Sequence, residues 1–120
     1  MSTTSETLVA LRGVFRRAIA TDAGEIRTLK AATRAEQRAG SPEAPKLQSR
    51  LARLRHAARA RHLAYSLWKG RTWAQIENNH PDGDPNLTVG VAKAWLEAAE
   101  AAGAPALPPS LGVHIARWLS

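Results

Sequence analysis

Lysine and arginine side chains are concentrated in one stretch of the chain, residues 46–71, where they could bind anions. This stretch holds eight of the seventeen Lys and Arg residues and no Asp or Glu. At about 100° per residue on a helix, most of them form two rows that flank an apolar stripe. Guanidinium and ammonium groups are the donors that hold phosphates. We therefore predict that an anionic partner contacts Lys46, Arg50, Arg53, Arg55, Arg59, Arg61, Lys69 and Arg71.

Residues suited to covalent or metal chemistry are sparse. The chain has no cysteine, which excludes disulfides, thiolate nucleophiles and zinc sites built on sulfur. Its four histidines lack metal-ligand spacing. Asp82 and Asp84 are similar to the start of a calcium loop, but Lys93 stands where the bidentate acid belongs. With no paired carboxylates and no nucleophile beside a base, we predict a non-enzymatic protein without a metal or cofactor.

The positive charge is confined to the N-terminal two thirds of the chain. Residues 1–76 carry fifteen Lys and Arg against five Asp and Glu, a balance of +10, whereas residues 77–120 carry two against five, a balance of −3. Such a field favours nucleic acid or an acidic protein surface. We expect no membrane partner, because no apolar run approaches the roughly 20 residues of a span, and the polar N-terminus predicts a cytoplasmic protein.

The elements that must position the basic residues begin with a helix predicted over residues 6–39. Ser5 and Glu6 suit its first turn. Asp22 interrupts its apolar face and leaves two interpretations open: with Glu25 it forms a capping box that breaks the helix, or it is a buried partner for an Arg on the second helix. We predict one long helix, with a kink allowed at 21–24. Its apolar face is Leu8, Leu11, Phe15, Ile19, Ile26 and Leu29.

A second helix is predicted over residues 44–69, after a turn rich in Gly and Pro. Because this turn is short, the two helices should pack antiparallel as a hairpin. We expect Leu51 and Leu54 to be buried against the first helix. The whole apolar stripe of the second helix comprises Leu47, Leu51, Leu54, Ala58 and Tyr65.

Three shorter helices are predicted to pack at one end of this hairpin, at 72–78, 88–102 and 110–119. The third of the four tryptophans, Trp95, lies in the middle one, whose apolar face we expect to be Val89, Ala92, Leu96 and Ala99. The fold class is therefore all-α, and residues 1–120 form a single domain with a basic hairpin (6–69) and a Trp-rich part (72–119).

Within residues 62–100, Gly70 and a capping Thr72 precede a short segment that ends in Ile76-Glu77. This stretch resembles a DNA-binding helix-turn-helix, with the short segment as the first helix of that motif. The resemblance implies that the helix at 88–102 reads DNA. Two features depart from the pattern: about ten residues separate the helices where the turn has three or four, and the second helix offers one Lys and two Glu to base edges. A core position for this helix is the alternative interpretation.

Charge and fold class together predict a small basic protein that binds nucleic acid through phosphate contacts, such as a phage or plasmid regulator. A protein-interaction module, such as an inhibitor of a nucleic-acid machine that docks on an acidic partner, is the alternative. A homodimer that pairs two hairpins into a four-helix bundle is the structural possibility.

Overall fold

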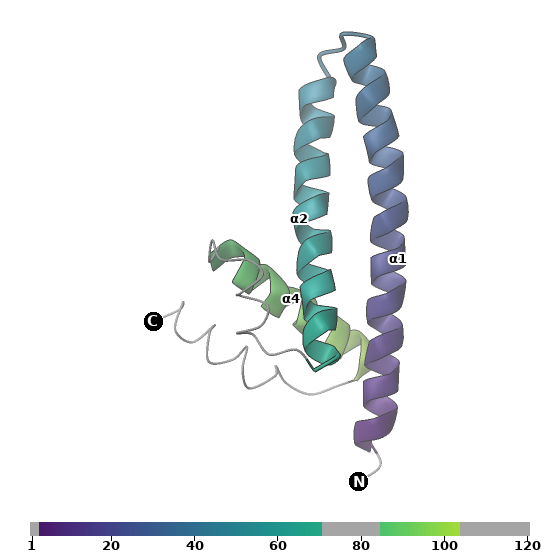
Figure 1. Ribbon diagram of the computed structural model, residues 1–120, viewed down its shortest axis with the longest axis vertical. Helices are drawn as coiled ribbons and strands as arrows, with labels where there is room; N and C mark the ends of the chain where they lie inside the picture. The colour runs from purple at the N-terminus through teal and green to yellow at the C-terminus, as the bar shows by residue number, and fades with distance from the viewer. Residues whose placement is uncertain (1–2, 71–84, 104–120) are drawn as a thin grey trace.

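The computed structural model describes residues 3–70 and 85–103 of the chain. Every regular element within those residues is a helix: α1 (Thr3–Arg38), α2 (Ala44–Trp68) and α4 (Pro85–Ala102). Helices α1 and α2 run antiparallel, and the shorter α4 crosses them at the end of the hairpin away from its turn (Figure 1). The predicted all-α class and long hairpin are confirmed. The helices expected at 72–78 and 110–119 lie outside the described residues.

Helix α1 is unbroken for 36 residues, so the alternative of a break near Asp22 is wrong. Gly24 lies in its interior, where the hydroxyl of Thr28 donates to the Gly24 carbonyl at 3.1 Å. A glycine weakens a helix by about 1 kcal/mol, which the flanking turns of so long a helix readily offset. The helix begins at Thr3, three residues before the predicted start at Glu6.

The turn of the hairpin forms as its sequence predicts. Gly40 has a φ of 66°, a left-handed conformation that glycine adopts without strain. The amide of Ser41 donates to the carbonyl of Glu36. This is the hydrogen bond that spans six residues in a Schellman motif, and it ends α1. Pro45 lies in the first turn of α2, where a backbone amide has no helical partner to lose.

The long helices meet along what we call the hairpin seam. Its positions alternate in steps of four and three residues, the spacing of a coiled coil. All are buried or half-buried: Phe15, Ile19, Asp22, Ile26, Leu29, Thr33 and Glu36 on α1, and Ala44, Leu47, Leu51, Leu54, Ala58, Arg61 and Tyr65 on α2. The stripe predicted on α2 lies in this seam, and Arg61 fills the position between Ala58 and Tyr65 that the apolar pattern omits.

The centre of the core lies where α4 meets the hairpin. Leu11 and Phe15 of α1 are 2% and 1% exposed there, and Phe15 packs on the rings of Tyr65 and Trp95 at centroid distances of 5.8 and 5.6 Å. Nearer the turn, none of the described helices besides α1 and α2 covers the seam (Figure 1), and Leu54 is half-buried there, not buried as predicted. A two-helix seam stays open to water along its edges.

The predicted apolar face of α4 is partly wrong. Val89 and Leu96 are each 49% exposed, whereas Trp95 is 8% exposed. Because α4 packs on both α1 and α2, its buried surface is wider than one stripe, and the largest side chain turns inward. Among residues 89–102 of α4, the buried ones are Val91, Ala92, Ala94, Trp95, Ala98 and Ala99.

Candidate functional site

The predicted anion-contact residues do not share one environment. Arg61 is half-buried, and Arg71 lies outside the described residues. Lys46 is exposed and lies 3.5 Å from the carboxylate of Glu43, an exposed pair of little energetic weight. The exposed members of the predicted set are Lys46, Arg50, Arg53, Arg55, Arg59 and Lys69.

Arg61 has a partner inside the protein. Its Nε donates to Oδ2 of Asp22 at 2.6 Å, and its Nη2 donates to Oδ1 at 2.5 Å. The side chains are 26% and 8% exposed, so this two-pronged ion pair lies within the seam. The hydrogen bond to Asp22 raises the pKa of Arg61, and burial opposes that rise. The interpretation of Asp22 as a buried partner for an Arg of the second helix is confirmed, and we leave Arg61 out of the candidate surface.

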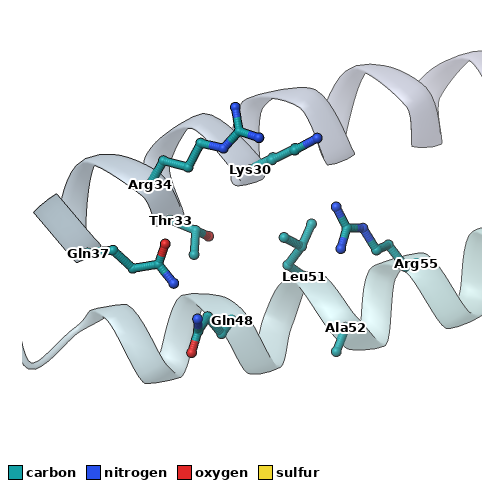
Figure 2. Close-up of a pocket in the computed structure, with 8 residues that line it drawn as sticks. All are labelled: Lys30, Thr33, Arg34, Gln37, Gln48, Leu51, Ala52 and Arg55. Atoms are coloured by element: carbon teal, nitrogen blue, oxygen red, sulfur yellow. The ribbon is translucent and has the colours of Figure 1, made fainter.

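A hollow of about 320 Å³ opens between α1 and α2 on the half of the hairpin nearer the turn. We call it the groove hollow. Figure 2 shows Thr33 and Leu51 between the two helices and Arg55 reaching from α2 toward α1. The full lining is Lys30, Thr33, Arg34 and Gln37 from α1, with Gln48, Leu51, Ala52 and Arg55 from α2.

The charge of the groove hollow is wholly positive. Lys30, Arg34 and Arg55 line it, and no acidic residue does. Within the residues that the structure describes, ion pairs join Lys46 to Glu43 and Arg61 to Asp22, and none involves the three cations of the hollow. Their charges therefore add, and an anion placed between the helices would be attracted from both sides.

The neutral polar groups of the hollow differ in what they can offer. The carboxamides of Gln37 and Gln48 can both donate and accept hydrogen bonds. Thr33 is 4% exposed, and its hydroxyl already donates to the carbonyl of Leu29 at 2.7 Å. Thr33 and the buried Leu51 therefore form the floor of the hollow, while the cations and carboxamides supply its donors.

Lys30 and Arg34 were not among the predicted contact residues. The signal that finds them is the register of the hairpin. With the turn near Pro42, a residue of α1 faces the residue of α2 at an equal distance along the chain from the turn, as Asp22 faces Arg61. By that rule, Arg55 faces Thr28, two residues before Lys30, and both cations line the same hollow. Considering each helix separately hides this convergence.

Two aromatic residues near the end of α2 stack on one another. The rings of Tyr65 and Trp68 lie 5.6 Å apart at 26°, and Nζ of Lys69 lies 4.7 Å from the centroid of Tyr65. Through this cation–π contact, the ammonium group of Lys69 already interacts with a side chain of the protein. Trp95 is in the core, and Trp73 and Trp118 lie outside the described residues.

A second hollow, of about 280 Å³, lies between α2 and α4 and has mixed charge. Arg61 and Lys93 line it together with Glu97, and its floor is made of alanines and Gly90. Opposite charges at one opening favour neither anions nor cations strongly. This hollow is the weaker candidate for binding a phosphate.

Helix α4, the reading helix in the helix-turn-helix interpretation, has the buried face described above and an exposed face bearing Lys93, Glu97 and Glu100. The motif's first helix lies outside the described residues, so the resemblance stays a prediction. Comparison with known protein families, curated sequences and solved structures finds no match to this chain. None of the described helices is long and apolar enough to cross a membrane.

Proposed function

We propose that this protein binds nucleic acid through the phosphate backbone, using exposed Lys and Arg residues of the hairpin and without reading sequence. The observation that carries the proposal is the groove hollow, which three cations from two helices line with no carboxylate among the lining residues. Phosphate contacts supply most non-specific affinity for nucleic acid. The +10 balance of residues 1–76 provides the attraction at longer range.

The absence of a base-reading element in the described residues supports backbone binding. An exposed face that carries Glu97 and Glu100 repels phosphates where a helix in the major groove needs attraction. The tryptophan of α4 is committed to the core. Side chains that hold phosphates fix position along the nucleic acid but carry no sequence information.

Equilibrium binding at several salt concentrations tests this function. Fluorescence anisotropy would follow labelled duplex DNA, duplex RNA and single strands between about 50 and 200 mM salt, a range in which a protein with many phosphate contacts loses much of its affinity. We expect the logarithm of the binding constant to fall by roughly 0.9 per contacted phosphate for each log unit of salt on duplex DNA. Scrambled sequences should bind equally well.

A complex that barely weakens across that range, or an absence of binding to every nucleic acid, would overturn the proposal. Either result would favour the alternative function, docking on an acidic protein.

A further inference from the structure

We propose that the groove hollow is a site for a single phosphate group, held between α1 and α2 by Lys30, Arg34 and Arg55. The identity of the phosphate as part of a nucleic acid rests on the proposed function, but the site itself rests on the geometry of the hollow. It assigns a binding role to two residues of α1 whose sequence pattern marks them only as outward-facing charges.

The arrangement of like charges is the first argument. Lys30 and Arg34 are four residues apart on one helix, a spacing at which equal charges repel. Arg55 reaches from α2 toward α1 (Figure 2), which adds a third positive charge to the same hollow. No acidic side chain lines the hollow to offset that repulsion. An anion bound between the helices would relieve it, and a doubly charged phosphate would do so best.

The donor set is the second argument. Arginine presents a planar fork of N–H groups that matches two phosphate oxygens, and lysine adds a point charge with three donors. The carboxamides of Gln37 and Gln48 lie toward the turn and can donate to a third oxygen or to a sugar hydroxyl. Side chains of these kinds accommodate a tetrahedral oxyanion, whereas no carboxylate is present to hold a cation.

Size is the third argument. A water molecule takes up about 30 Å³ in the liquid, so a hollow of about 320 Å³ has room for a phosphate and its neighbouring sugar. The floor of Thr33 and Leu51 is 4% and 7% exposed, which closes the hollow on the inner side. The anion would therefore lie in the groove with the rest of the nucleic acid directed to solvent.

Paired substitutions on α1 test the site within the nucleic-acid complex. Lys30→Gln with Arg34→Gln removes two charges at the hollow, and Arg12→Gln with Arg16→Gln removes two exposed charges of equal spacing elsewhere on α1. We expect the first pair to weaken binding at least about tenfold and to lower the salt slope by roughly 0.9, as for one lost phosphate. The control pair should weaken binding by less than about threefold, because it changes only the long-range field.

Equal losses from the two pairs would overturn the site and leave the backbone-binding function standing. Circular dichroism melts of the unsubstituted protein and both pair variants would verify that the hairpin is folded, since the substituted side chains are exposed. If a double variant unfolds, Arg55→Gln with Arg12→Gln as its control gives the same comparison with single substitutions.

Inorganic phosphate is the probe that tests the site independently of nucleic acid. In NMR titrations of the full chain, we expect saturable shifts of the side-chain amides of Gln37 and Gln48 and of Nε of Arg55. Chloride at equal ionic strength should leave these signals in place, and Arg55→Gln should abolish the response of the two carboxamides. Identical shifts with chloride and phosphate would overturn the site. Phosphate-specific shifts in a protein that binds no nucleic acid would support the site while refuting the proposed function.

Oligonucleotides with and without a 5′-phosphate distinguish the two sources of the phosphate group. Tighter binding of the phosphorylated strand, lost in the Lys30 and Arg34 pair variant, assigns the hollow to a terminal phosphate. Equal binding of the two strands, with the same loss in that variant, assigns it to an internal phosphodiester. A variant that binds both strands as tightly as the unsubstituted protein would overturn the site for either source.

Discussion

The carboxylate of Asp22 and the guanidinium of Arg61 lie in the hairpin seam at positions that a coiled coil usually fills with apolar residues. Their mutual hydrogen bonds must offset the cost of removing both charges from water. The raised pKa of Arg61 means that its stabilising effect is present at every pH below that pKa and is lost only in strong alkali. Near neutral pH the contribution of Arg61 should therefore be constant.

The first prediction concerns the two halves of this ion pair. Arg61→Met should destabilise the protein by about 3–5 kcal/mol, because it leaves the carboxylate of Asp22 buried without a partner. Asp22→Leu should cost less, since the side chain of Arg61 is 26% exposed and can extend its charge into water. The double variant should be close to the original protein in stability. Urea denaturation of the three variants measures these differences.

If the double variant proves as unstable as Arg61→Met, apolar packing cannot replace the ion pair at these positions. In that case the pair would be a requirement of the hairpin and not one of several solutions to the seam.

At the residue scale, sequence could predict the pairing of Asp22 only as one of two alternatives. The deciding fact is that Arg61 occupies the gap between Ala58 and Tyr65 in the apolar stripe of α2. A gap in each stripe at matching distances from the turn is a signal that needs both helices at once. The same reasoning places Lys30 within one helical turn of Thr28, the residue opposite Arg55.

Among the elements, the second prediction contrasts the three-helix core with the open seam. Phe15→Ala should cost about 3–5 kcal/mol, because the ring is 1% exposed and contacts side chains of both α2 and α4. Ile26→Ala, at a half-buried seam position, should cost less than half as much. Thermal melts compare them. Similar losses of stability from the two substitutions would mean that the seam is shielded from water as well as the core is.

A third prediction uses two glycines inside helices. A Cβ added at Gly24 would meet nothing within 4 Å, so Gly24→Ala should stabilise α1 by about 0.5–1 kcal/mol. A Cβ added at Gly90 would lie 3.3 Å from the Cβ of Ala60, which is itself buried where α4 crosses α2. We expect Gly90→Ala to lower the melting temperature. Stabilisation by both changes would show that α4 can shift away from α2 without loss.

The bounds of the elements were largely predictable, because Gly and Pro mark the turn and the apolar periodicity marks each long helix. The orientation of α4 was not. Its sequence is rich in alanine, so several faces are apolar enough to pack, and the position of Trp95 decides among them only once α4 meets two helices. Val89 and Leu96 were assigned inward from spacing alone, which cannot report how many partners a helix has.

For the whole molecule, the groove hollow and the acidic residues of α4 lie toward opposite ends of the hairpin. The half of the hairpin nearer the turn projects beyond α4 (Figure 1) and carries the groove hollow. The α4 end contributes the core and an exposed face with two glutamates. A long anionic partner can therefore lie against the projecting half without approaching α4.

The last prediction distinguishes that arrangement from DNA reading by α4. Arg55→Glu with Arg59→Glu reverses two exposed charges on α2 and should remove most nucleic-acid binding while the helices remain folded. Lys93→Glu reverses an exposed charge on α4, four residues before Glu97, and should change affinity by less than about threefold. Anisotropy titrations at low salt measure both, and circular dichroism verifies folding. If Lys93→Glu abolishes binding while the α2 pair has no effect, the nucleic acid contacts α4, and the helix-turn-helix interpretation must replace the hairpin as the binding surface.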